Sequence, residues 1–157
     1  MNQFDSEQVR RIWQRVQSGN ELPQSPADTP PGTDFAKLSD AEREISRLYL
    51  QLSRYFPGQN SRLLHQLSRQ AQSRAVTLRG ICHLCDCDCP PAPVVPQRNT
   101  NPRLLLHRCY ALSRQAAAAY RRQEAHPQFG AVFEKMAARQ EECCATLLSL
   151  LGRLKNG

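Results

Sequence analysis

The stretch LSDAEREISRLYLQLSRYF, residues 38–56, decides the fold of this 157-residue chain. Its bundle-facing positions recur at alternating steps of four and three residues: Leu38, Glu42, Ile45, Tyr49, Leu52 and Phe56. This spacing places one stripe of side chains along a helix that faces other helices. Ser39 with Glu42 three residues later fits a capping box, and Pro57 is a helix breaker. A helix is therefore predicted over residues 39–56.

Three later segments carry the same period, over residues 60–85, 102–125 and 128–154. Their seam positions are Leu64, Leu67, Ala71, Arg74, Leu78, Ile81 and Cys85 in the first, Leu106, Cys109, Ser113, Ala116, Tyr120 and Gln123 in the second, and Phe129, Phe133, Met136, Gln140, Cys143, Leu147, Leu150 and Leu154 in the third. Short loops separate the helices within each pair, and the proline-rich residues 85–102 separate the two pairs. We expect an all-α, antiparallel four-helix bundle made of two helical hairpins joined by a long crossover.

The N-terminal part of the chain has a different composition. Residues 6–17 predict a short amphipathic helix with Val9, Ile12, Trp13 and Val16 on one face. Residues 18–36 are rich in proline and predict a linker. We therefore divide the chain into residues 1–36, the short helix with its linker, and residues 37–157, the bundle. The short helix is expected to dock on the bundle or on a protein partner.

Five seam positions are not occupied by ordinary apolar residues: Glu42, Arg74, Ser113, Gln140 and Cys143. They fall at matching heights in the four predicted helices. A buried charge without a partner costs roughly several kcal/mol. We therefore expect Glu42 to pair with Arg74, and Ser113 and Gln140 to complete the hydrogen bonds.

The two predicted hairpins repeat one another. Glu42 precedes Tyr49 by seven residues, and Ser113 precedes Tyr120 by the same number. The first and third helices align at an offset of 71 residues, and the second and fourth at 69. Duplicated hairpins packed about a pseudo-twofold axis would give this pattern.

With these seams, residues 38–154 resemble the ferritin-like superfamily, in particular its small rubrerythrin-type bundles. In that family the first and third helices each give a Glu ligand, and the second and fourth each give Glu-x-x-His, to a di-iron site. The resemblance maps these six ligand positions onto Glu42, Ala71, Arg74, Ser113, Gln140 and Cys143. Only Glu42 keeps the family's residue, while Glu44, Glu141 and Glu142 lie outside the seams.

The resemblance therefore implies a degenerate site. One carboxylate beside the permanent positive charge of Arg74 cannot neutralise and bridge two iron ions. A di-iron cofactor is not expected, although the family relationship implies an ancestor that handled oxygen or peroxide. The family often pairs into dimers, so a homodimer is also implied.

Four cysteines lie within CHLCDCDC, residues 82–89: Cys82, Cys85, Cys87 and Cys89. Four thiolates are the usual ligands of a structural zinc site, and soft sulfur also suits Cu(I). These four residues are therefore the candidate metal site. Redox or disulfide chemistry and the absence of any role are the alternatives. Free thiols or metal ligands are expected rather than structural disulfides, because the chain is expected in the cytoplasm.

The other cysteines and the histidines are assigned ordinary roles. We expect Cys109 and Cys143 to be small core residues and Cys144 to be less buried. His65, His107 and His126 are expected at the surface or at its boundary with the core.

The net charge of +7 is unevenly distributed, with thirteen arginines and three acidic residues between Arg43 and Arg122. A solvated, arginine-rich helix exterior is preferred over a nucleic-acid-binding surface, because no aromatic stacking platform accompanies the charge. No apolar run approaches the roughly 20 residues of a membrane span. The N-terminus also lacks a basic region followed by an apolar stretch, so no secretory signal is expected.

Three functions remain open. The first is a non-enzymatic ferritin-like protein that binds a thiophilic metal through its cysteine-rich crossover. The second is an interaction module that uses the N-terminal helix or the arginine-rich surface. The third is a rubrerythrin-like, iron-dependent oxidoreductase that acts on peroxide or oxygen. The sequence nominates no catalytic residue, since it contains no Gly-rich phosphate loop and no catalytic triad motif.

Overall fold

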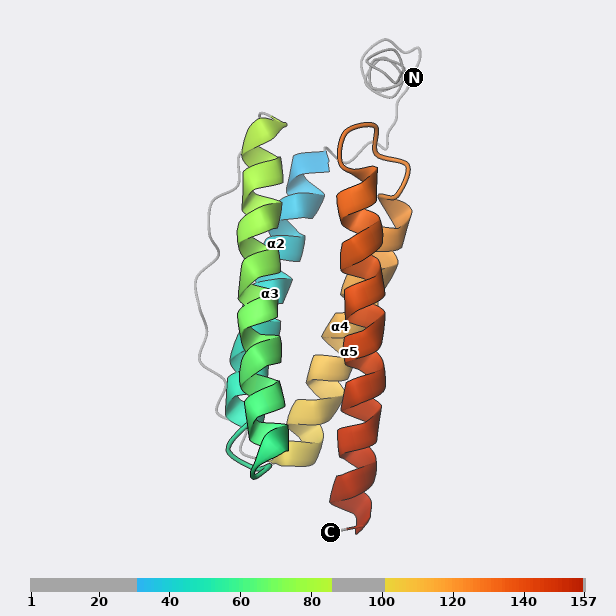
Figure 1. The fold of residues 1–157 in the computed structure, drawn as a ribbon. Helices are drawn as coiled ribbons and strands as arrows, with labels where there is room; N and C mark the ends of the chain where they lie inside the picture. The colour runs from blue at the N-terminus through green and yellow to red at the C-terminus, as the bar shows by residue number, and fades with distance from the viewer. Residues whose placement is uncertain (1–30, 86–100, 157) are drawn as a thin grey trace.

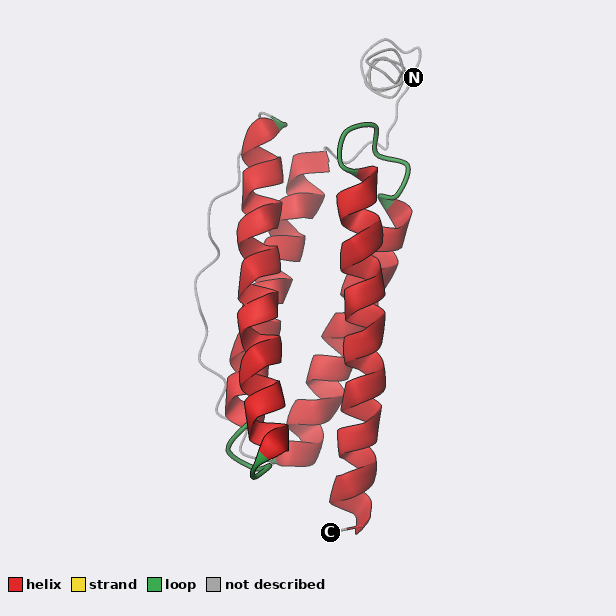
Figure 2. Cartoon of the chain, in the orientation of Figure 1, coloured by secondary structure: helices red, strands yellow, loops and turns green. Residues whose placement is uncertain are grey.

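A computed structural model describes residues 31–85 and 101–156 of the chain, which form four helices (Figure 2). The helices are α2 (Pro31–Leu52), α3 (Gln59–Leu84), α4 (Pro102–Arg122) and α5 (Gly130–Asn156). They pack as a four-helix bundle, which confirms the all-α prediction (Figure 1). Following the colours of Figure 1, the chain runs down α2, up α3, up α4 and down α5. The predicted helix over residues 6–17 lies outside the described residues.

The packing is closest within the two hairpins. α2 lies against α3, α4 lies against α5, and α2 also contacts α4 between the hairpins. Each hairpin is closed by a short turn, as predicted (Figure 2). In the part of the chain that the structure describes, no helix is both long and apolar enough to cross a membrane.

The helix α2 begins earlier than predicted, at Pro31 instead of Ser39. The capping-box prediction is therefore wrong. Ser39 lies inside the helix, fully buried, and its hydroxyl donates to the Ala75 carbonyl oxygen at 3.0 Å. Proline is well tolerated in a first turn, since its missing N–H would have no partner there. The earlier start extends the seam backwards to Phe35, which is fully buried although it was assigned to the linker.

The α2–α3 turn also begins earlier than predicted, because α2 ends at Leu52. Phe56 still packs into the core from the turn. Gly58 then adopts φ +66°, a left-handed conformation that glycine adopts without strain. The Gly58 carbonyl oxygen accepts from the Arg62 N–H at 3.2 Å and so helps to start α3.

The helix α4 begins as predicted, with Pro102 in its first turn. The residue before it, Asn101, is the N-cap, and its Oδ1 accepts from the Arg103 N–H at 2.9 Å. The α4–α5 turn uses a different cap. His126 Nδ1 accepts from the N–H groups of Gln128 at 3.2 Å and Phe129 at 3.1 Å, so the residue caps the start of α5. Its assignment as an ordinary boundary residue missed this role.

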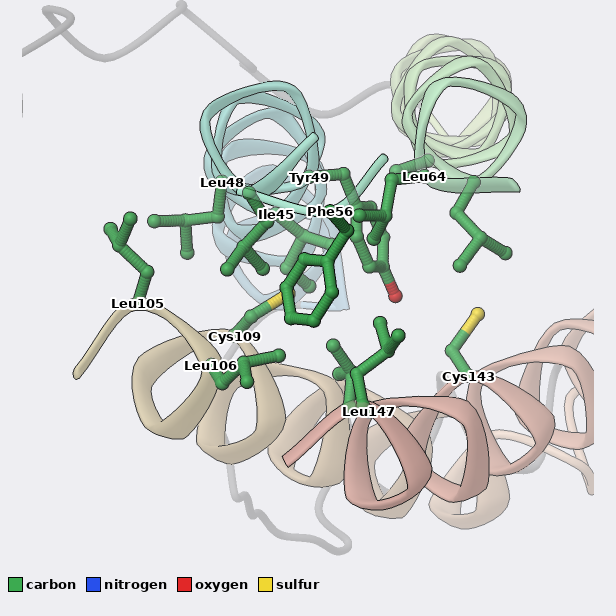
Figure 3. Close-up of a cluster of buried hydrophobic side chains, with 14 residues drawn as sticks. Ile45, Leu48, Tyr49, Phe56, Leu64, Leu105, Leu106, Cys109, Cys143 and Leu147 are labelled. Carbon is green, nitrogen blue, oxygen red and sulfur yellow. The ribbon is translucent and has the colours of Figure 1, made fainter. Parts of the chain in front are cut away.

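The predicted seams form the core, which consists of two apolar clusters. The first, the α2–α3-turn cluster, is partly shown in Figure 3 and comprises Ile45, Leu48, Tyr49, Leu52, Phe56, Leu64, Leu67, Ala71, Leu105, Leu106, Cys109, Cys143, Leu147 and Leu150. The second, the α4–α5-turn cluster, comprises Phe35, Leu38, Leu78, Ile81, Cys82, Ala116, Tyr120, Phe133, Met136 and Ala137. On every helix one polar seam position falls between the two clusters.

Candidate functional site

The polar seam residues meet at Glu42. Its Oε2 accepts hydrogen bonds from Arg74 Nε at 2.9 Å, from Gln140 Nε2 at 2.8 Å and from the Tyr120 hydroxyl. Each donor comes from a different helix, so α2, α3, α4 and α5 all contribute to one network. We call Glu42, Tyr49, Arg74, Ser113, Tyr120 and Gln140 the polar layer.

The position of the polar layer follows from the seams. On α2, Glu42 lies between Leu38 of the α4–α5-turn cluster and Ile45 of the α2–α3-turn cluster. On α3, Arg74 lies between Ala71 and Leu78 in the same way. The polar layer therefore separates the two apolar clusters, at the height where the seam pattern predicts it.

Because they are buried, the two charges of the polar layer, on Glu42 and Arg74, depend on one another. Glu42 is fully buried, and 7% of the Arg74 surface is exposed. Burial by itself lowers the pKa of Arg74, but the charge of Glu42 and its hydrogen bond outweigh burial and leave the pKa raised. The guanidinium therefore stays protonated inside the bundle and neutralises the carboxylate.

The predicted pairing is confirmed for Arg74 and Gln140 and is wrong for Ser113. The Ser113 side chain is fully buried, but its hydroxyl makes no hydrogen bond to Glu42 and interacts only with the Cys109 thiol among the described residues. The Tyr120 hydroxyl, and not that of Ser113, donates the third hydrogen bond to Glu42.

The direction of helix side chains explains why a tyrosine reaches the polar layer from seven residues away. Side chains lean towards the N-terminus of their helix, so a long one covers a lower-numbered turn. Tyr120 therefore leans back towards the turn of Ser113 and its hydroxyl meets the Glu42 carboxylate there, and Tyr49 leans back in the same way on α2. The seven-residue offset shared by both tyrosines is the sequence signal that could have placed their hydroxyls here.

Tyr49, the second tyrosine of the polar layer, lies close to two cysteine thiols. In Figure 3 the Tyr49 hydroxyl points away from α2 towards α4 and α5, and Cys109 and Cys143 lie on those helices. Burial, followed by the two thiols, raises the pKa of Tyr49. Burial is also the main reason that the pKa values of Cys109 and Cys143 are raised. Both cysteines are free and buried, as predicted, and their thiols remain protonated and poor as nucleophiles or ligands.

The remaining carboxylates near the mapped ligand positions turn away from the polar layer. Glu44 accepts from Arg108 at 2.5 Å, and Glu141 accepts from Arg121 at 2.8 Å, both at the surface. Glu142 is exposed as well. Their expected places outside the seams are confirmed. None of these three carboxylates therefore adds negative charge beside Glu42.

The donor set does not fit a pair of iron ions. Two of the mapped ligand positions hold unsuitable residues. Ala71 is buried and has no ligand atom, and Arg74 carries a positive charge. The only carboxylate of the polar layer already accepts three hydrogen bonds on Oε2. Within residues 31–85 and 101–156, no group of three or more His, Cys, Asp and Glu side chains could hold a metal ion.

The candidate thiolate site is only partly described. Cys82 is buried and Cys85 half-buried, and the Cys85 N–H donates to the Cys82 carbonyl oxygen at 3.2 Å at the end of α3. Cys82 is disulfide-bonded, which differs from the expected free thiol, whereas Cys85 forms no disulfide. The crowding of four cysteines in eight residues makes oxidation possible without distant parts of the chain. Cys87 and Cys89 lie outside the described residues.

No protein-family model matches the chain, and no curated protein matches it.

Proposed function

We propose that this protein is a ferritin-like, antiparallel bundle of the rubrerythrin type that has lost di-iron catalysis and binds a thiophilic metal ion. The metal, Zn²⁺ or Cu(I), would be held by Cys82, Cys85, Cys87 and Cys89. One observation carries the proposal: a guanidinium, that of Arg74, lies at a mapped ligand position and pairs with the one retained ligand, Glu42.

The ion pair supports the loss of iron chemistry on electrostatic grounds. Two iron ions need several carboxylates that neutralise and bridge them. Glu42 would have to give up the Arg74 guanidinium, which would then remain buried, unpaired and close to the cations. Both changes are unfavourable, because a buried charge without its partner costs roughly several kcal/mol.

The end of α3 supports the thiolate site. The Cys85 N–H donates to Ile81 and Cys82 carbonyl oxygens at 3.0 and 3.2 Å, so both cysteines belong to the same final turn. The C-x2-C spacing that places them there is common in zinc sites. Binding through all four sulfurs requires reduction of the Cys82 disulfide, so metal binding and oxidation would exclude one another.

Metal analysis of the full chain tests the proposal. The protein is purified anaerobically with a non-thiol reductant and without chelators, and its metals are measured by mass spectrometry. A variant with Ser at positions 82, 85, 87 and 89 is treated in parallel. Cys144→Ser, which changes a free, half-buried thiol elsewhere, is the matched control. We expect about one zinc or copper ion per chain in the wild type and the control, and none in the four-serine variant.

Two other results would contradict the proposal. About two iron ions per chain in both the wild type and the four-serine variant would mean that the mapping of the polar layer is wrong and that the protein is an oxidoreductase. Absence of metal from every sample, including samples supplied with zinc or Cu(I), would leave a helical scaffold. The search would then turn to partners of residues 1–36.

A further inference from the structure

Five polar atoms of the polar layer are buried and have no nitrogen or oxygen hydrogen-bond partner among the described residues. They are Glu42 Oε1, the Tyr49 hydroxyl oxygen, Arg74 Nη2, Ser113 Oγ and Gln140 Oε1. All four helices contribute. Buried polar atoms in proteins are nearly always hydrogen-bonded, either to protein or to ordered water. Five exceptions at one height of one bundle therefore need a physical explanation.

The residues that carry these atoms interact with one another. Glu42, Arg74 and Gln140 are joined by direct hydrogen bonds, so their unpaired atoms lie within the same network. The charge of Arg74 also acts on the Tyr49 hydroxyl and on the Cys143 thiol. The Tyr49 and Ser113 hydroxyls also interact with the Cys109 thiol, but a thiol is only a weak hydrogen-bond donor and acceptor. Tyr49 and Ser113 are thus neighbours of the ion pair.

The hydrogen-bonding chemistry of these five atoms indicates which small molecule they would bind. Arg74 Nη2 can only donate, Glu42 Oε1 can only accept when ionised, and the Tyr49 and Ser113 hydroxyls can do both. A cation would be repelled by Arg74 and an anion by Glu42. A small neutral molecule that both donates and accepts satisfies the whole set, and water is such a molecule.

We propose that the centre of the bundle encloses a cluster of ordered water molecules bound by Glu42, Tyr49, Arg74, Ser113 and Gln140. This binding site is independent of metal binding at the cysteines. Glu42, Tyr49, Ser113 and Gln140 are fully buried, and Arg74 alone keeps 7% of its surface exposed. The water molecules are therefore shielded from bulk solvent, and their residence is long compared with surface hydration.

Two conservative variants test the proposal without breaking any of the three hydrogen bonds to Glu42. Tyr49→Phe and Ser113→Ala each remove one of the unpaired atoms. Ser46→Ala is the matched control, since the buried Ser46 hydroxyl donates to the Ser68 carbonyl oxygen at 3.0 Å and so needs no water. The number of long-lived internal water molecules is measured on the full chain by oxygen-17 relaxation dispersion of the solvent, with circular dichroism as the check of folding.

We expect a dispersion from long-lived water in the wild type. Its amplitude should fall in both Tyr49→Phe and Ser113→Ala and stay unchanged in Ser46→Ala. Each of the two variants should also raise the unfolding equilibrium constant about fivefold, the usual effect of one lost hydrogen bond. The opposite result overturns the proposal: in a dry polar layer both variants keep the wild-type amplitude, and both become more stable because a buried unpaired group has been removed.

Discussion

The guanidinium of Arg74 on α3 and the carboxylate of Glu42 on α2 form an ion pair at 2.9 Å, with side-chain exposures of 8% and 0%. The pair joins the two helices of one hairpin. It is also tied to the other hairpin, because Tyr120 and Gln140 donate to the same carboxylate oxygen. Both charges are largely shielded from bulk water, so each depends on the other.

Removing one member of this pair should be much more harmful than removing both. Arg74→Met leaves Glu42 as a buried carboxylate without its cation, and we expect the free energy of unfolding to fall by about 3–5 kcal/mol. Urea denaturation followed by circular dichroism measures this change.

The double variant Glu42→Gln with Arg74→Met is the control for that experiment. It removes both charges and keeps two side chains of similar volume, so most of the lost stability should return. Strictly additive losses in the two single variants would show instead that the two charges act independently.

The cysteines of the bundle should differ sharply in reactivity. Cys109 and Cys143 are buried, and burial raises the pKa of both thiols. Because the thiolate is the reactive form, we expect both residues to resist a thiol reagent at pH 8 until the protein unfolds. The half-buried Cys85 and Cys144 should be modified first. Peptide mapping by mass spectrometry after timed labelling distinguishes the sites, and early labelling of Cys109 would contradict the packing.

Gly130 is required where the chain enters α5. A Cβ atom at this position would lie 2.3 Å from the carbonyl oxygen of Glu124, a backbone atom that cannot move freely. Gly130→Ala should therefore lower the free energy of unfolding by about 1–3 kcal/mol. In the same helix a Cβ at Gly152 would meet nothing within 4 Å. Gly152→Ala should be neutral or stabilising by up to about 1 kcal/mol, and equal losses in the two variants would be inconsistent with this account.

His126 should make stability sensitive to pH. Burial lowers its pKa below the ordinary value of 6.5, so the folded state favours the neutral ring. The unfolded chain then binds a proton first as the pH falls. Stability from His126 is therefore complete above about pH 6.5 and is lost as the pH falls through the folded-state pKa. Thermal denaturation between about pH 7 and pH 5 measures this slope.

A conservative variant isolates the titration of His126 from its capping role. In His126→Asn an amide oxygen can still accept from the Gln128 and Phe129 N–H groups, but the side chain no longer titrates. The pH slope should become smaller than in the wild type. An unchanged slope in His126→Asn would assign the pH dependence to another group.

Periodicity predicted the bundle because burial on a helix repeats with a fixed spacing. Every predicted seam position from Leu38 to Phe56 is buried, as are Arg74 on α3 and Gln140 on α5. The seam pattern also predicted the Glu42–Arg74 ion pair, because two opposite charges buried at one height of a bundle are expected to pair. The ends of the helices were predicted less accurately. The capping box of Ser39 and Glu42 is a local pattern, and the same residues serve tertiary contacts inside a longer helix.

The site itself was predicted only in part. A spacing rule counts Cα positions, whereas a hydrogen bond depends on where the end of a side chain lies. A tyrosine hydroxyl reaches a turn away from its own Cα, so Tyr120 entered the polar layer without interrupting the apolar pattern. Ser113 has the opposite property, since its short side chain occupies the right height but does not reach Glu42. The Cys82 disulfide depends on redox state, which spacing does not encode.

The three hydrogen bonds on Glu42 also fix the axial register of the bundle. An apolar seam alone would tolerate the sliding of one helix past its neighbours by a turn, since leucine packs against leucine at either height. A slip of one turn, about 5.4 Å, would carry Arg74, Tyr120 or Gln140 away from the carboxylate and place it against apolar side chains. The correct alignment of all four helices is thus the only one in which Glu42 keeps three donors, and misaligned bundles are disfavoured by the same residue that stabilises the correct one.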